Sequence, residues 1–439
     1  MIHAEGLSSA EVRAEDRRLI WHSWTAQDQE LPLAVAGGEG SWVWDFEGER
    51  YLDFSSQLVN TNLGHQHPAV IAAIRHQAAI LTTAAPTVAV ASRNQAAASI
   101  LDVSPDHFEK VFFTGGGTDA VENAIRMARG HTGRRKVLSA YRSYHGNTGI
   151  SIAATGDPRR IGNEFATDHV HFFRPHPYRS SFWSESPEQE TTRALEHLRQ
   201  VIEFEGGESI AAVLLETVLG SGGVVPPTPG YLPGVRRLCD EFGIQLILDE
   251  VMVGFARTGS WWAFEHYDVV PDLVTFAKGV NSGYVPLGGV LVPGHYTQSF
   301  TERNYPGGLT YMGHPLACAS AVASIRAMHA EGVVAHAAAL GHEVLGPGLR
   351  DLRDRFEVVG DVRGIGAFWA LEFVTGPDSR APVPAAQVQQ LGRSLLQRGI
   401  LALIVANRLH VAPPCNITGR DAQRGIALIA DAVSEVWEG

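Results

Sequence analysis

Residues 273–289 have the sequence LVTFAKGVNSGYVPLGG, in which Lys278 ends a short apolar run and is followed by glycines, a proline and small polar residues. Such a run is typical of a strand that is buried on both faces of a sheet. An ammonium group at the inner end of a buried strand is partly withdrawn from water. Burial disfavours its charged form, and the neutral amine is a nucleophile.

Similar apolar runs recur through the middle of the chain and alternate with helical patterns. The predicted strands are 111–113, 136–139, 211–215, 244–248, 273–277 and 288–292, with a helix at 119–129. Continuous Val, Ile and Leu runs separated by helices indicate a parallel or mixed sheet covered on both faces. The sequence therefore predicts an α/β architecture.

The two ends of the chain have a different pattern. Residues 41–53, SWVWDFEGERYLD, alternate apolar and polar side chains around a Glu-Gly turn and predict a hairpin. Beyond about Gly332 we expect strands at 357–363 and 368–373, a helix at 386–397 and a last helix from about Gly419. We expect three segments: 1–60 and 331–439 would build one smaller domain, and 61–330 a large one.

Composition excludes several classes of function. The 439 residues carry a formal net charge of -12 and no block of Lys and Arg, which argues against a nucleic-acid partner. The three cysteines have neither disulfide nor zinc spacing, so no metal site is expected. No apolar run is long and uncharged enough to span a membrane, and no secretory leader is seen. We expect a cytoplasmic protein with no membrane partner.

Three ionisable residues directly end predicted strands: Glu216, Asp249 and Lys278. Ligands of open α/β sheets bind at the carboxyl ends of the strands. One such residue alone is often only a polar group where a strand meets solvent, but three together favour a functional site. Pyridoxal phosphate requires a lysine that forms an imine and a carboxylate that holds the ring nitrogen. Lys278 and Asp249 are the candidates for these two roles.

A phosphate site and a ring contact are needed as well. In FFTGGGTDAVENAIRMAR, residues 112–129, three glycines precede a helix whose free amide groups and dipole could face a phosphate. Thr118 could add a hydroxyl, and Asp119 could cap the helix. In YRSYHGNTG, residues 141–149, either Tyr144 or His145 could stack on an aromatic ring.

Together these segments resemble the class III pyridoxal-phosphate-dependent aminotransferases, also called ω-aminotransferases. The resemblance covers nearly the whole chain in order, through DFSSQLVNTNLGHQHPAV, FFTGGGTDAVENAIRMAR, YRSYHG, LILDEVMVGFARTG, TFAKG and GGLTYMGHPLACASA. It implies the fold type I of pyridoxal-phosphate transferases. In that fold a large domain surrounds a mostly parallel seven-stranded sheet, beside a smaller α+β domain built from both chain ends.

The resemblance also assigns roles at the cofactor. Lys278 would form the Schiff base and shuttle the proton, and Asp249 would pair with the pyridine nitrogen. Val251 and Tyr144 would cover the two ring faces, with His145 adjacent.

Further roles concern the phosphate and the partner subunit. Gly116, Gly117 and Thr118 would hold the phosphate, although many relatives have Ser-Gly-Ser there. Thr310 would reach the phosphate of the neighbouring subunit, which implies a homodimer with active sites at its interface; a tetramer is an alternative. Glu216 would lie behind the cofactor or toward the substrate.

Substrate residues follow from the same resemblance. Arg408, in LIVANRLHVAPPCNIT, could hold the carboxylate of a 2-oxo acid through its planar fork. Trp24 and Gln57 are at positions that line the substrate pocket in the family, whereas Met312 replaces a common small serine. SWTAQ, SSQLVNTNLGHQHP and NRLHVAPPCNIT are most similar to the taurine-type branch. This branch implies ping-pong transfer from a taurine-like or β-alanine-like donor, or a related amine, to pyruvate or 2-oxoglutarate.

Other functions stay open at this point. A decarboxylase, an aminomutase or a phospho-lyase would reuse the same cofactor residues, and a biosynthetic transaminase would act on a larger aldehyde or ketone. A non-enzymatic regulator would be expected to have lost the lysine or the aspartate, and both are present.

Overall fold

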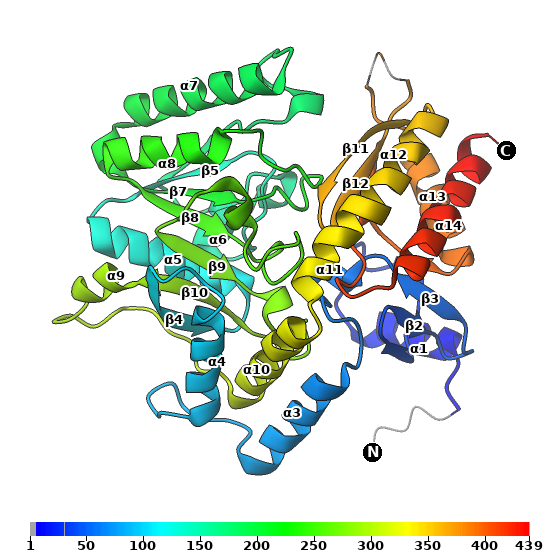
Figure 1. Cartoon of the computed structure of the whole chain (residues 1–439), viewed down its shortest axis with the longest axis horizontal. Coiled ribbons are helices and arrows are strands. Elements are labelled where there is room, and N and C mark those ends of the chain that lie inside the picture. The colour runs from blue at the N-terminus through cyan, green and yellow to red at the C-terminus, as the bar shows by residue number, and fades with distance from the viewer. Residues whose placement is uncertain (1–5, 30, 377, 379, 439) are drawn as a thin grey trace.

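The computed structural model describes residues 6–29, 31–376, 378 and 380–438. Its largest element is a seven-stranded sheet with the order β4-β10-β9-β8-β7-β5-β6 (Figure 1). Strand β10 runs opposite to the other six strands of this sheet, so the predicted mostly parallel sheet is confirmed. Its strands are β4 (Phe108–Thr114), β5 (Lys136–Ala140), β6 (His169–Phe172), β7 (Ile210–Glu216), β8 (Gln245–Asp249), β9 (Leu273–Phe276) and β10 (Gly288–Pro293).

The central strands are buried on both faces because helices cover both sides of the sheet. Along β7 the side chains alternate: Ala212 and Leu214 pack with helix α5 (Gly117–Thr132), whereas Val213 and Leu215 face the opposite core. The opposite core includes residues of α8 (Tyr231–Phe242) and α7 (Pro187–Glu205), which lie together in Figure 1. The continuous apolar run of β7 therefore contributes side chains to the hydrophobic cores on both faces of the sheet.

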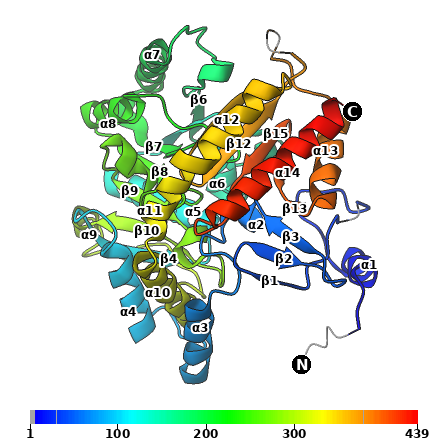
Figure 2. The ribbon, with the colours of Figure 1, turned by 45° about the vertical axis from the view of Figure 1, so that its right-hand side comes forward.

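Both ends of the chain contribute to one further sheet, with the order β1-β2-β3-β13. The predicted hairpin forms between β2 (Trp42–Trp44) and β3 (Arg50–Asp53), and β13 (Ile400–Leu401) pairs in parallel with β3. Figure 2 shows these N-terminal strands beside the C-terminal segment. The proposed domain boundaries at residues 60 and 330 stay predictions.

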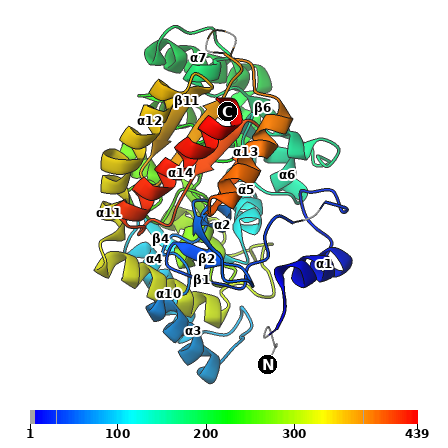
Figure 3. The same ribbon diagram turned by 90° about the vertical axis from the view of Figure 1, so that its right-hand side faces the viewer.

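An antiparallel sheet with the order β11-β12-β15-β14 completes the C-terminal part. Its strands are β11 (Val359–Ile365), β12 (Phe368–Phe373), β14 (Leu403–Val405) and β15 (Arg408–Val411). Three helices lie over this part in Figure 3, namely α12 (Gly346–Arg355), α13 (Ala385–Gln397) and α14 (Gly419–Trp437). The other elements are α1 (Ser9–Leu19), β1 (Gly37–Glu39), α2 (Ser56–Val59), α3 (Pro68–Ile80), α4 (Ala91–Leu101), α6 (Gly149–Ala154), α9 (Gly294–Gln298), α10 (Pro315–Ala330) and α11 (Val333–Leu340).

Two sequence predictions need correction or addition. Helix α5 begins at Gly117, two residues before the predicted start, and Asp119 is its third residue instead of its cap. Strands β6, β13, β14 and β15 have only two to four residues each and are not predicted from the sequence. Within the part of the chain that is described, no helix is long and apolar enough to cross a membrane.

Candidate active site

The carboxyl ends of β7, β8 and β9 open into a cavity of about 1330 Å³. Glu216 and Asp249 are direct neighbours across β7 and β8, as the parallel register requires. Most of the predicted site residues line this one cavity: Trp24, Gly116, Gly117, Thr118, Tyr144, His145, Glu216, Asp249, Val251, Lys278 and Arg408. Residues from distant parts of the chain are therefore brought together around one cavity, and their individual roles stay predictions.

Lys278 follows β9 directly and has a backbone φ of +48°, which is uncommon for a residue with a side chain. Burial lowers the pKa of its ammonium, and the nearby carboxylates of Asp249 and Glu216 act in the opposite direction. None of the described carboxylates lies within 4.0 Å of its Nζ atom, so the amine is not used in a salt bridge. A strained backbone and an amine without an ion-pair partner are typical of a functional lysine.

Asp249 is buried at the end of β8 and is held by two contacts. Its Oδ2 atom accepts a hydrogen bond from His145 Nδ1 at 2.8 Å, and its Oδ1 atom accepts one from the Val251 amide at 3.0 Å. The other ring nitrogen of His145, Nε2, has no partner among the described residues. The His145 ring thus lies against Asp249 and orients that carboxylate, which leaves Tyr144 as the better candidate for the ring contact.

Glu216 is a buried carboxylate that sequence reasoning placed only loosely. It accepts hydrogen bonds from the backbone amides of Tyr144 at 2.9 Å and Gly220 at 2.7 Å. Burial raises the pKa of Glu216, and nearby His145 lowers it. Glu216 therefore fixes the backbone beneath Tyr144 and the start of the loop after β7.

The glycine turn before α5 leaves the helix amino end open. Gly116 occupies the position before the first helical residue, and no side chain caps the helix. A methyl group built at Gly116 would meet no atom within 4 Å, whereas one at Gly117 would lie 2.8 Å from Val251 Cγ1. The Asp119 carboxyl instead accepts a hydrogen bond from the Gly115 backbone amide, and burial raises the pKa of Asp119. Free amides at this open end suit the phosphate of a cofactor.

We expect Gly117→Ala to weaken cofactor binding about tenfold, because the added methyl displaces Val251 and overpacking costs about 1–3 kcal/mol. The apo protein should also melt at a lower temperature. Gly116→Ala is the matched control and should leave the apo melting temperature unchanged, since its methyl has open space. Cofactor titration and thermal melts measure both effects. A Gly117→Ala protein with unchanged affinity and melting would contradict the proposed packing.

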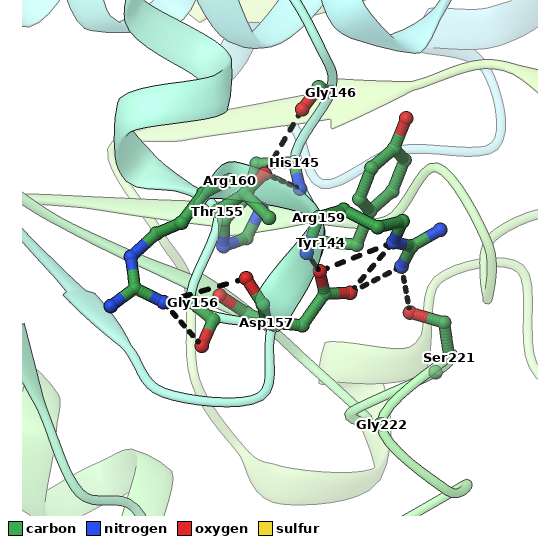
Figure 4. A network of polar contacts seen from close by, with 12 residues as sticks. Tyr144, His145, Gly146, Thr155, Gly156, Asp157, Arg159, Arg160, Ser221 and Gly222 are labelled. Atoms are coloured by element: carbon green, nitrogen blue, oxygen red, sulfur yellow. Dashed lines mark hydrogen bonds and ion pairs between the residues drawn. The ribbon is translucent and has the colours of Figure 1, made fainter. Parts of the chain in front are cut away.

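Tyr144 is covered by a residue that sequence reasoning did not assign to the site. The Arg159 guanidinium lies 3.7 Å from the centre of the Tyr144 ring. Figure 4 shows it held between Asp157 and Ser221, whose hydroxyl accepts from Arg159 Nη2 at 2.9 Å. Arg159 stands in an Arg-Arg pair, which in sequence looks like a solvated face or an anion contact.

The three predicted substrate residues have different positions. Arg408 lines the cavity, and its Nη1 atom donates to the Gly222 carbonyl at 2.7 Å. Trp24 also lines it and is 64% exposed. Gln57 does not line the cavity of its own chain, and its role at the substrate stays a prediction. The backbone φ of Gln57 is +59°, and this turn directs its amide to Asp53 Oδ2 at 3.0 Å, so the neighbouring Leu58 lines the cavity instead.

Thr310 is exposed between α9 and α10 and does not line the cavity of its own chain. The adjacent Tyr311 is 72% exposed. This segment is therefore available to a second subunit, and its role there stays a prediction.

Comparison with known proteins gives a family match over almost the whole chain. The model of the class III aminotransferases matches residues 24–433. A 5-aminovalerate aminotransferase of Pseudomonas aeruginosa is 32% identical over 92% of this chain and 94% of its own length. A probable 4-aminobutyrate aminotransferase of Bacillus subtilis is 33% identical over 85% of this chain and 87% of its own.

Solved structures agree with this match. A taurine:2-oxoglutarate aminotransferase from Bifidobacterium kashiwanohense, in complex with pyridoxal phosphate and glutamate, has a TM-score of 0.95 at 38% identity and 99% coverage of both chains. An (S)-enantioselective ω-transaminase from Thermomicrobium roseum has a TM-score of 0.93 at 36% identity and 98% coverage of both.

The residues at the cavity fit the cofactor of these enzymes. The Lys278 amine, which has no ion-pair partner, suits the aldehyde of the cofactor. The buried carboxylate of Asp249 suits the ring nitrogen, and the open amino end of α5 suits the phosphate. With this geometry, the family match and the fold in agreement, the chain belongs to the class III aminotransferases and is a pyridoxal-phosphate-dependent enzyme of fold type I.

Proposed function

We propose that this enzyme moves an amino group from an ω-amino acid or amine, such as taurine or β-alanine, to pyruvate or 2-oxoglutarate in a ping-pong reaction. The observation that carries the proposal is the presence of Lys278 and Arg408 in one cavity. Relatives named for 5-aminovalerate, 4-aminobutyrate and taurine support it.

The bound cofactor supplies an electron sink for the bond that is broken. Lys278 would hold it, and the side-chain amine would carry the proton from the donor carbon to the cofactor carbon that receives the amino group. Asp249, oriented by His145, would stabilise a proton on the ring nitrogen. The remaining contacts are the ring faces and the phosphate, which we assign to Val251, Tyr144, Gly116, Gly117 and Thr118. Glu216 supports this arrangement through the Tyr144 backbone.

Arg408 is suited to the acid group that both substrates share. Its side chain donates only to backbone carbonyls, those of Gly222 and Val405, and no carboxylate among the described residues lies within 4.0 Å of it. An ω-amino acid carries an acid group at one end and its amine at the other. A 2-oxo acid also carries a carboxylate, so one guanidinium can serve both half-reactions.

We further propose a homodimer in which exposed Thr310 reaches the phosphate of the partner's cofactor, with a tetramer as an alternative. A cytoplasmic location is proposed as well. Its support is that Cys239, Cys318 and Cys415 are buried free thiols, which is typical of reduced compartments.

A donor screen tests the proposed reaction. Taurine, β-alanine, 4-aminobutyrate, 5-aminovalerate and butylamine are each incubated with pyruvate and with 2-oxoglutarate. We expect turnover of at least one ω-amino acid, with formation of its carbonyl product. Arg408→Gln should raise KM about 10–100-fold for acid-bearing donors, as expected for a lost hydrogen bond to a charged group. For butylamine, which has no acid group, the rise in KM should be smaller.

Two outcomes would contradict this proposal. Release of carbon dioxide or phosphate from the donor would indicate a decarboxylase or a phospho-lyase. An equal rise in KM for all donors in the Arg408→Gln protein would show that Arg408 does not bind the acid group.

A further inference from the structure

The loop between β7 and α8 collects arginine side chains on one wall of the cavity. A bridge between Leu219 and Val225 closes this loop. The backbone carbonyl of Gly222 accepts from Arg408 Nη1 at 2.7 Å, and the carbonyl of Gly223 accepts from Arg363 Nε at 2.7 Å. Figure 4 shows Ser221 and Gly222 of the loop beside Arg159.

Arg142 belongs to the same wall. A methyl group built at Gly222 would lie 2.7 Å from the Arg142 carbonyl oxygen, so the two backbones are in close contact. Arg142 also lines the cavity, as do Arg179 and Arg408. Two of these arginines, Arg142 and Arg408, thus flank one glycine.

Most of the other arginines at this wall are already paired with carboxylates. Arg159 pairs with Asp157. Arg179 and Arg363 both bind the buried carboxylate of Glu372. Burial alone would raise the pKa of Glu372, but these two guanidinium groups outweigh it and lower that pKa.

Arg142 differs from them because its guanidinium has no internal partner. No described residue accepts a hydrogen bond from it, and no described carboxylate lies within 4.0 Å. Its backbone is also in the left-handed region, with φ +71°, and is fixed there by a hydrogen bond from its amide to the Gly156 carbonyl at 3.0 Å. Burial lowers the pKa of Arg142, and Arg179 adds to this effect. None of the Arg142 nitrogens is among the fully buried atoms that lack a partner, so its donors remain open to the cavity, where they can bind an anion.

We infer that Arg142 and Arg408 together form a two-acid position, which makes a 2-oxo dicarboxylic acid such as 2-oxoglutarate the preferred amino acceptor. This inference rests on the proposed function. One carboxylate of the acceptor binds Arg408 and the other binds Arg142. Pyruvate has a single carboxylate and leaves one guanidinium without a partner. Arg142 is thus a specificity-determining residue of the acceptor half-reaction.

The binding test uses the holoenzyme and two inert five-carbon acids. Glutarate carries two carboxylates, and pentanoate carries one. By calorimetry we expect the native protein to bind glutarate at least about tenfold more tightly than pentanoate, since a hydrogen bond to a charged group contributes about 1.5–3 kcal/mol. Arg142→Gln should remove this difference.

Arg160→Gln is the matched control. Arg160 is the neighbouring arginine of the Arg159 pair, its Nη1 atom lies 3.4 Å from the Gly156 carbonyl, and it does not line the cavity. The Arg160→Gln protein should keep the preference for glutarate.

Steady-state kinetics give the second measurement. Arg142→Gln should raise KM about 10–100-fold for the dicarboxylic acceptor 2-oxoglutarate, while KM for pyruvate stays within about threefold. Thermal melts show whether each variant is folded. Arg142→Lys keeps the charge, so it should raise KM for 2-oxoglutarate less than Arg142→Gln does.

The following results would overturn the inference. Equal binding of glutarate and pentanoate by the native protein would exclude a two-acid position. An equal rise in KM for both acceptors in Arg142→Gln, or the same losses in Arg160→Gln, would show that Arg142 has no selective role. Failure of the proposed function is distinguishable, because the donor alone would then not convert the bound cofactor even in the native protein.

Discussion

Lys278→Ala should reduce amino transfer about 10⁴-fold, the upper end of what a positioned proton-transfer group contributes. Both the covalent attachment of the cofactor and the proton shuttle are lost with this one amine. The holoenzyme should also lose the visible absorption of the lysine-linked cofactor, while the phosphate contacts near Gly116 and Gly117 still allow weaker binding. Absorption spectra and single-turnover rates measure these effects.

The chain offers unusually simple controls for this prediction, because Lys110, Lys136 and Lys278 are its only lysines. Lys136 is paired with Glu205 at 2.8 Å, away from the cavity, so Lys136→Ala should keep both the absorption and the activity. Borohydride reduction of the native holoenzyme should fix the cofactor on the peptide that contains Lys278. A label on Lys110 or Lys136, or an active Lys278→Ala protein, would contradict the assignment.

Asp249→Asn should lower the transfer rate about 10²–10³-fold, the loss typical of removing one preorganised electrostatic contact. The amide keeps the shape of the side chain but cannot stabilise a proton on the ring nitrogen as a carboxylate does. The contact of His145 with this residue is also weakened, since an anion is the stronger acceptor.

His145→Ala separates the contribution of the Asp249 carboxylate from that of its contact with His145. It leaves the Asp249 carboxylate in place but removes its neighbour, so we expect a smaller loss than in Asp249→Asn. Pre-steady-state rates of the donor half-reaction compare the two variants. A fully active Asp249→Asn protein, or a larger loss in His145→Ala, would show that the ring nitrogen is held by another group.

The strand ends were the most predictable part of this enzyme. Glu216, Asp249 and Lys278 follow continuous apolar runs, and parallel strands bring such ends to one edge of the sheet. The glycine turn at 115–117 was also readable, because a close turn before a helix has a local sequence signal. The first turn of α5 was less so, since Asp119 is an acceptable cap by residue type yet lies inside the helix.

Other features depend on contacts that no local pattern contains. The Gln57 side chain turns to Asp53 because residues 56 and 57 both have positive φ values. A Ser-Gln pair in the sequence does not predict such values. Arg142 is separated by 80 residues from Gly222, on which it packs, and Arg408 comes from strand β15 near the end of the chain. Their common wall exists only after the C-terminal part has folded against the loop after β7.

The donor half-reaction tests the proposed reaction most directly. Native holoenzyme is mixed with an ω-amino acid such as taurine or β-alanine in the absence of any 2-oxo acid. We expect loss of the visible absorption in a single turnover, with one carbonyl product per subunit and no carbon dioxide or phosphate released. Addition of 2-oxoglutarate should then restore the absorption. An unchanged spectrum with every ω-amino acid, or release of carbon dioxide or phosphate without the carbonyl product, would contradict it.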